Sequence, residues 1–502
     1  MPLFRLGGAE PARALRSPAP PATTRQPGHP LPAPPIPAWA GAEWDVVVVG
    51  GGNAAVASAI AADERGARVL ILERAPRQMR GGNTRHTRNV RCIHGRGEFN
   101  TGSYSFDELW NDLCNVGEGP NDEELARFTV RDSESLPAWM YAHGARWQRP
   151  LSGTLQLDRT NRFFLGGGKA LLNSYYRYLA TRPNVSVAYD AKVEDFEFDG
   201  ARCTAVIVAA EGRRLRVAAR AVVCASGGFE ANVEWLRRYW GDAVDNYIIR
   251  GTPYNDGHVL ARLYDAHAAT AGQEKGFHAI ALDARAPKFD GGIATRLDVI
   301  PYGIVLNNSG DRFYDEGEDI WPKRYAMWGR NIADQADQIA TALWDSKVNH
   351  LFLPPMNGAA RADTITDLAV LLGLDPGKAS RTVAEFNAAV KPGGQFDPTF
   401  LDNCHTADIT PEKSHWAQPL DRPPYYGVVM RPGVTFTYMG VAVNRDGLVR
   451  RTDGSTFANV FAAGEIMSGN ILSTGYLAGF GMTIGSVWGR QTGRKAAEYV
   501  TR

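Results

Sequence analysis

Three small residues and one acid near the start of the chain stand at a spacing that suits the binding of a dinucleotide. Gly50, Gly52 and Ala55 follow the pattern G-x-G-x-x-A, and Glu73 lies 21 residues after Gly52. A glycine at 50 permits a tight turn, and a glycine at 52 lets backbone N–H groups approach a pyrophosphate. A small residue at 55 lets a helix pack closely on a strand, while Glu73 is placed to accept hydrogen bonds from an adenosine ribose.

The segments around these residues predict the elements that position them. Val46–Val49 is a short apolar run typical of a buried strand, residues 54–64 are compatible with a helix, and Val69–Leu72 is a second apolar run. Further transitions between apolar strands, glycine turns and helices follow at 165–180, 185–229 and 458–481. This alternation of strands and helices predicts a mostly parallel sheet.

Composition divides the chain into three parts. Residues 1–42 hold 11 of the 30 prolines and a single acid, so we expect a disordered Pro-rich tail there. Aromatic residues, Pro and Gly become frequent from 273 to 433, and nucleotide-type turns occur on both sides of this block. We therefore predict an α/β protein in which a discontinuous Rossmann-like domain, residues 43–272 and 434–502, contains an inserted α+β substrate-capping domain at 273–433.

The overall totals exclude several classes of function. Lys and Arg number 55 and Asp and Glu number 54, a balance that argues against a nucleic-acid partner. No apolar stretch approaches the roughly 20 residues that a membrane-spanning helix needs. The five cysteines have neither metal-ligand nor haem-attachment spacing, which is typical of reduced thiols in a cytosolic protein. No metal site is predicted.

Four motifs together resemble the flavoprotein family of fumarate reductases, succinate dehydrogenases and 3-ketosteroid dehydrogenases. They are VVVVGGGNAA with LILE, the GGNT turn, ASGGF with NDG, and AAGEI. The resemblance covers residues 43–502 and implies that the Rossmann-like domain binds FAD. Segments such as IIRGTPYNDG and RFYDEGEDIWPKRYA are similar to the branch that oxidises tricarballylate to cis-aconitate.

The resemblance also implies which residues surround FAD. The implied cofactor residues are Gly50, Gly52, Asn53, Ala55, Glu73, Arg74, Gly82, Asn83, Thr84, Asp256, Gly464, Glu465, Gly479 and Gly481. Among them Asp256 is expected toward the isoalloxazine ring and Glu465 at the ribityl chain, while a helix that opens at 479–481 points its dipole at the flavin. His86 is the candidate for a covalent bond to FAD, but the GGNT motif is typical of the family members that bind FAD non-covalently.

Oxidation of a CH–CH bond beside carboxylates needs a hydride acceptor, a proton acceptor and cations that hold the carboxylates. The resemblance to fumarate reductases implies Arg324 as the proton carrier, relayed by Arg312 and Glu316. A carboxylate clamp or a surface ion pair is the alternative role for Arg324. His278 is implied as a carboxylate ligand, with a structural core histidine as the alternative. Tyr476 is implied as a hydroxyl that polarises a carbonyl, with a core aromatic as the alternative.

Two departures from the fumarate reductase pattern argue against fumarate itself as the substrate. Residues 435–437 replace a His-His-Thr stretch, and no cation stands near 474–476, where the family has an Arg clamp. A third carboxylate could instead be held by one of five arginines, each of which is otherwise a solvated surface charge. These are Arg88, Arg91, Arg250, Arg296 and Arg431.

Three functions stay open on sequence alone. The first is a cytoplasmic dehydrogenase of the tricarballylate type, with a small tricarboxylate as its substrate. Its external electron acceptor would be a membrane iron–sulfur/haem protein, which would hold it at the inner face of the membrane. The second is a flavin enzyme resembling fumarate reductase or 3-ketosteroid dehydrogenase, favoured by Tyr476. The third is a flavin-binding electron-transfer or structural subunit. The cations at 85–91 and 323–324 favour the first, because a steroid pocket is lined mainly by apolar groups.

Overall fold

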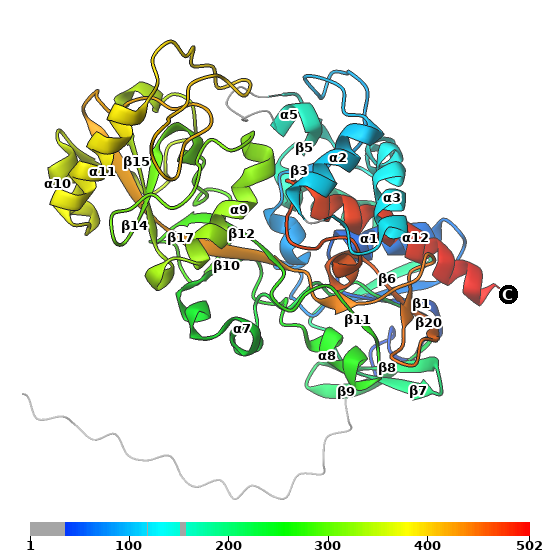
Figure 1. Ribbon diagram of the computed structural model, residues 1–502. Coiled ribbons are helices and arrows are strands. Elements are labelled where there is room, and N and C mark those ends of the chain that lie inside the picture. The colour runs from blue at the N-terminus through cyan, green and yellow to red at the C-terminus, as the bar shows by residue number, and fades with distance from the viewer. Residues whose placement is uncertain (1–35, 118, 151–156, 502) are drawn as a thin grey trace, which may run out of the picture. The chain divides into compact units, whose positions relative to one another are not determined.

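Two large β-sheets, one of eight strands and one of seven, organise the described part of the chain in a computed structural model (Figure 1). The structure describes residues 36–117, 119–150 and 157–501. We predicted a disordered tail at residues 1–42, and residues 1–35 of that tail lie outside the described residues. Residues 39–502 form one compact unit, within which both sheets lie.

The centre of the first sheet is built from the predicted apolar runs. β1 (Trp44–Val49) pairs in parallel with β2 (Val69–Leu72) on one side and with β9 (Arg213–Cys224) on the other. The strand order is β19-β20-β9-β1-β2-β6, and every neighbouring pair except β19–β20 is parallel. The remaining strands are β6 (Val185–Ala188), β7 (Lys192–Asp199), β8 (Arg202–Ala210), β19 (Leu448–Arg450) and β20 (Thr456–Ala462).

The sheet is mostly parallel, as predicted, but it also has an antiparallel part. β7, β8 and β9 form an antiparallel meander. The reason is the length of the connections: β8 and β9 are joined by Glu211 and Gly212 alone, both with positive φ. Two residues with positive φ make the tight turn of a hairpin, whereas a parallel crossover needs a dozen or more residues.

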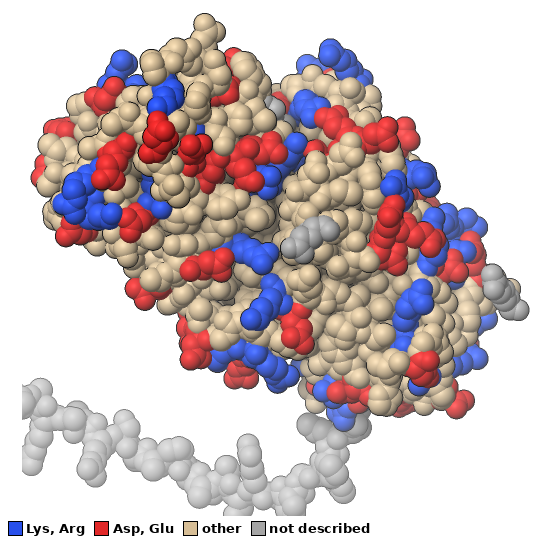
Figure 2. All heavy atoms as spheres, in the orientation of Figure 1, with Lys and Arg blue, Asp and Glu red and all other residues tan. Residues whose placement is uncertain are grey.

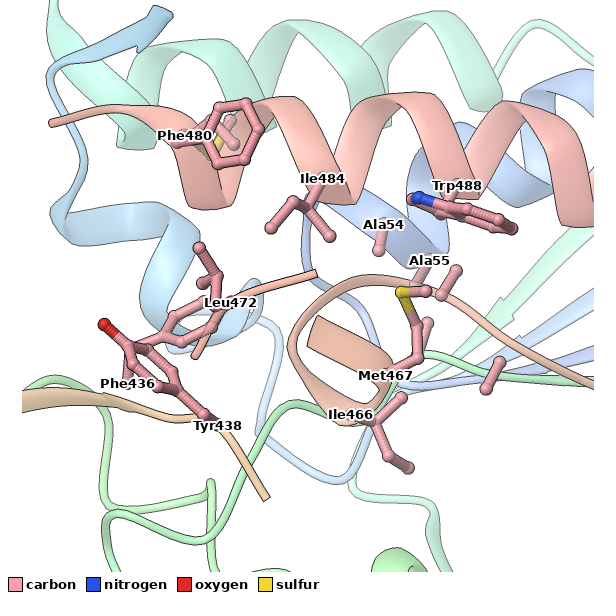
Figure 3. Packing of buried hydrophobic residues seen from close by; sticks show 14 of the residues in the cluster. Ala54, Ala55, Phe436, Tyr438, Ile466, Met467, Leu472, Phe480, Ile484 and Trp488 are labelled. Carbon is pink, nitrogen blue, oxygen red and sulfur yellow. The ribbon is translucent and has the colours of Figure 1, made fainter. Parts of the chain in front are cut away.

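Two helices from opposite ends of the chain pack against each other beside this sheet. α1 (Asn53–Asp63) follows the glycine turn, and α12 (Phe480–Val500) is the last helix. Glycines recur every four residues along α12, and a Cβ at Gly489 would lie 2.6 Å from the carbonyl oxygen of Ala54. The backbones therefore approach closely, and Ile484 and Trp488 flank the contact (Figure 3).

Among the remaining helices before the second sheet, α6 (Gly167–Leu179) confirms the helix predicted within 165–180. The others are α2 (Phe106–Val116), α3 (Glu123–Asp132), α4 (Leu136–Ala142), α5 (Leu157–Thr160), α7 (Val233–Trp240) and α8 (His258–Asp265). Ser105 and Asp122 cap α2 and α3, where their side chains accept hydrogen bonds from the first turn. A small three-stranded sheet has the order β3 (Asn89–Arg91), β5 (Asn161–Phe164) and β4 (Trp147–Gln148). A two-stranded sheet pairs β11 (Thr270–Ala271) with β18 (Gly440–Val441).

The second sheet is organised around one long strand, β17 (Tyr425–Thr437). Its order is β13-β10-β17-β15-β14, and β12 and β16 also pair with β17. The other elements are β10 (Ile248–Arg250), β12 (Phe277–Asp283), β13 (Phe289–Asp290), β14 (Ile304–Asn307), β15 (Ala340–Asp345), β16 (Ala360–Ala362), α9 (Trp321–Ala333), α10 (Ile365–Leu372) and α11 (Pro376–Ala389).

β10 belongs to the stretch 43–272 that the sequence assigned to the first domain, yet it pairs with β17 in the second sheet. The exact division into domains stays a prediction. Within the described ranges, no helix is long and apolar enough to cross a membrane.

Candidate active site

A cavity with an empty volume of about 1560 Å³ opens at the carboxyl end of β1, beside the turn that leads into α1. This volume includes space that is open to solvent. Ala55 does not line it and lies fully buried in α1. All the other predicted cofactor residues do line it: Gly50, Gly52, Asn53, Glu73, Arg74, Gly82, Asn83, Thr84, Asp256, Gly464, Glu465, Gly479 and Gly481.

The backbone around the turn leaves space and donors for an anion. Gly50 has a φ of 114°, and a Cβ there would collide with the carbonyl group of Ala225. α1 begins after Gly52 and α12 after Gly479, and neither N-terminus has a side-chain cap. The N-terminus of α1 favours a phosphate or another negative group, whereas the first N–H groups of α12 already donate to Leu477, Tyr476 and Gly479. These features fit FAD.

One end of the cavity carries the predicted ribose acid. Glu73 is buried and accepts hydrogen bonds from the backbone N–H groups of Ala75, at 2.9 Å, and Gly81, at 3.1 Å. Burial raises the pKa of this carboxyl. Asp256, which we expected beside the isoalloxazine ring, lies instead at this end, because it forms an ion pair with Arg74 at 2.5 Å.

Three guanidinium groups line another part of the cavity: Arg88, Arg250 and Arg296. The guanidinium of Arg88 makes no hydrogen bond or ion pair with any of the described residues. Repulsion from Arg296, together with burial, lowers the pKa of Arg88 to about 9. Arg250 donates to the Thr435 hydroxyl at 3.0 Å, and Arg296 pairs with Asp298 at 2.6 Å. This wall therefore carries more positive than negative charge.

His278 stands beside these cations, on β12. Its ring stacks on Tyr476 with centroids 3.9 Å apart, and its Nδ1 is buried without a hydrogen-bond partner among the described residues. Burial, Arg250 and Arg296 hold the pKa of His278 well below its usual range, so the ring is neutral. Both His278 and Tyr476 line the cavity, as expected for residues that touch a substrate.

Tyr325 is a cavity residue that the sequence reasoning missed. Its hydroxyl lies 3.4 Å from Nε2 of His278, and the Arg296 guanidinium lies 5.5 Å from its ring centroid. Burial raises the pKa of Tyr325, while the surrounding guanidinium groups act in the opposite direction. It follows Arg324 directly in an aromatic stretch of α9, and nothing in the sequence set it apart from a core residue.

The predicted proton relay does not reach the cavity. Arg312 donates to Glu316 at 3.0 Å, and this pair is almost fully buried, with the Arg312 guanidinium over the ring of Phe386. Arg324 lies near the start of α9 and pairs with Glu318 at 3.0 Å. None of the three lines the cavity wall, because each is held by a partner within the second sheet or its loops.

Three of the five further arginines reach the cavity, and two do not. Arg91 is fully buried and donates to Ala478 and to the Tyr104 hydroxyl. Arg431 donates to backbone carbonyls at the surface. His86 lines the cavity, where burial and Arg250 lower its pKa to about 4.

The sequence of this chain matches those of known proteins. The family model described as "FAD binding domain" matches residues 45–481, so the chain belongs to this family of FAD-dependent oxidoreductases. It is 26% identical over 441 residues to the NADH:fumarate oxidoreductase of Klebsiella pneumoniae (strain 342), an alignment that covers 85% of this chain and 44% of that protein. It is 24% identical over 476 residues to the urocanate reductase of Eggerthella lenta, covering 90% and 74%.

The fold is shared with solved flavoproteins. The open conformation of a flavocytochrome c3 fumarate reductase superposes with a TM-score of 0.70 at 20% identity, covering 92% of this chain and 79% of that one. This confirms the predicted α/β class, with an FAD-binding part and a capping part. The chain spans less than half the length of the first relative, 44%, and about three quarters of the second, 74%.

Proposed function

We propose that this protein is an FAD-dependent oxidoreductase that acts on a CH–CH bond flanked by carboxylates. The observation that carries the proposal is the convergence of Arg88, Arg250 and Arg296 in the same cavity as the dinucleotide turn. Buried guanidinium groups bind carboxylates bidentately, and a guanidinium without a partner favours an anionic ligand strongly. On the face shown in Figure 2 basic and acidic side chains are interspersed.

The side chains supply binding, orientation and a proton site. FAD, when bound, would exchange a hydride with the substrate. The arginines would hold the carboxylates and so fix the position of the two reacting carbons. They would also lower the pKa of the substrate C–H group that loses its proton. The Tyr325 hydroxyl lies among these cations, 3.4 Å from Nε2 of His278, and can donate a proton when a substrate is reduced. To accept the proton during oxidation it must first ionise, which the guanidinium groups favour and burial opposes. Arg324, which we predicted as the carrier, would need to leave Glu318 to act.

Tricarballylate is the substrate that we propose within this class. Its three carboxylates match three guanidinium groups in number and charge, and its oxidation would give cis-aconitate. A wall with this charge is a poor surface for a steroid. We expect FAD to be bound non-covalently, and electrons to pass to an external acceptor, because no group of three potential metal ligands occurs among the described residues.

Reduction of an unsaturated acid is the second candidate. The relatives support it, because those named above are a fumarate oxidoreductase and a urocanate reductase. The same arginines would serve either direction, since a catalyst accelerates a reaction and its reverse.

An anaerobic flavin assay tests both. We expect the purified protein to be yellow, to be bleached by tricarballylate and not to reduce NAD. Dithionite-reduced protein that is reoxidised by fumarate or urocanate, with no bleaching by tricarballylate, would favour the second candidate. Bleaching by a ketosteroid alone, or a colourless protein that takes up no flavin, would refute the proposal.

A further inference from the structure

Two buried carboxyl groups meet at the edge of the cavity without a cation between them. Glu465 lines the cavity, and Glu230 lies behind it with none of its surface exposed. Oε1 of Glu230 accepts hydrogen bonds from the side-chain amides of Asn83, at 2.6 Å, and Asn255, at 2.8 Å. Oε1 of Glu465 accepts one from the Thr437 backbone N–H at 3.0 Å.

The second oxygen of Glu230 shows what joins the pair. Oε2 of Glu230 is buried and has no hydrogen-bond partner among the described residues, and the side chain of Glu230 interacts with the carboxyl of Glu465. Two carboxylates cannot hydrogen-bond each other, because both would be acceptors and both negative. A proton between them satisfies the oxygen and removes one charge.

The surroundings decide where the proton lies. Two amide donors stabilise a negative charge on Glu230, whereas no Lys, Arg or His within the described residues hydrogen-bonds either acid. Burial raises the pKa of Glu230 to about 7 and that of Glu465 well above its usual range. Tyr476 is a further titratable group that interacts with Glu465, and burial raises its own pKa.

We propose that Glu465 faces the bound FAD as a neutral acid whose proton is held by Glu230, so that this pair makes FAD affinity depend on pH. Glu230 acts as a positioning residue, because it touches FAD only through Glu465 and Asn83. Loss of the proton would place a second negative charge beside an anionic cofactor. The inference depends on FAD binding and not on which acid is the substrate.

The test is the affinity of the full-length flavin-free protein for FAD between pH 6 and 8.5, followed by flavin fluorescence. For the wild type we expect the dissociation constant to rise above the pKa of the pair, approaching tenfold per pH unit. Glu465→Gln replaces the acid by an amide that still donates to Glu230, so its dissociation constant should stay constant across this range. Glu234→Gln, an exposed control on α7, should keep the wild-type slope.

Infrared spectroscopy of the flavin-free protein gives a second readout. At pH 6 we expect the C=O band of a protonated carboxylic acid in the wild type, its weakening as the pH rises to 8.5, and its loss in both Glu465→Gln and Glu230→Gln. A wild-type slope in Glu465→Gln, or no such band in the wild type, would overturn the inference. Since the band needs no cofactor, it is informative even if a variant binds FAD poorly or the proposed reaction is not found.

Discussion

The substitution Arg88→Gln should change stability and substrate binding in opposite directions. The guanidinium of Arg88 has no partner among the described residues, and Arg296 and burial lower its pKa from 12.5 to about 9. Such a shift corresponds to a cost of at most about 5 kcal/mol for carrying the charge in the folded protein. Water in the cavity screens the repulsion, so we expect the substrate-free variant to gain about 1–3 kcal/mol.

The same change should remove substrate binding. Truncation of one member of a buried charge pair typically costs about 2–5 kcal/mol, which corresponds to a loss of affinity of about 30-fold or more. Because the lowered pKa keeps Arg88 protonated below about pH 9, the destabilisation that it causes is constant from pH 6 to 8 and disappears only as the pH rises above 9.

Thermal unfolding with and without tricarballylate measures both effects. For a chain of this length about 1 kcal/mol corresponds to about 1 °C, so Arg88→Gln should melt about 1–3 °C above the wild type without ligand. Tricarballylate should stabilise the wild type and not the variant. Arg431→Gln, at the surface, should change neither value. The reasoning would be refuted by a variant that melts lower and is still stabilised by tricarballylate.

Three further changes test the fold and the electrostatics. Gly493→Ala should destabilise the protein by about 1–3 kcal/mol in thermal melts, because its Cβ would meet the backbone of Ser58. Gly377→Ala, whose Cβ would make only ordinary van der Waals contacts, should be neutral or stabilising. Arg312→Ala should cost about 3–5 kcal/mol in urea unfolding with FAD still bound, since it leaves a buried carboxylate unpaired. Burial lowers the pKa of His278, so below about pH 6.5 the unfolded chain binds more protons than the folded protein. The free energy of unfolding should therefore decrease by about 1.4 kcal/mol for each pH unit by which the pH falls below about 6.5, and by less in His278→Asn.

The dinucleotide unit could be predicted from sequence because its physical requirements are local. Glycines at 50 and 52, apolar strands on either side and Glu73 all act within one strand–turn–helix–strand segment, and the structure has β1, α1 and β2 within two residues of the predicted bounds. Glycines also recur every four residues in the sequence of α12, but only the structure identifies α1 as the helix that packs against them.

The cations of the cavity could not be chosen from sequence, because their convergence is a long-range property. Arg88 follows the GGNT turn, Arg250 ends β10 and Arg296 lies in a loop after β13, so their meeting depends on strand pairing with β17. The opposite error arose at Arg312 and Glu316. Their spacing of four residues suits a relay, but it equally suits the buried ion pair that the structure contains. Glu230 had no local signal at all.

The two ends of the chain that meet in α1 and α12 have a consequence for biosynthesis. The turn at Gly52 and the loop at Gly464 are separated by more than four hundred positions, so a ribosome adding about 5–20 residues per second needs roughly 20–80 s to supply the second after the first. During that interval α1 lacks α12, the helix that packs against it. Nascent chains should therefore depend on chaperones until α12 has left the ribosome, and the complete flavin site can form only from then on.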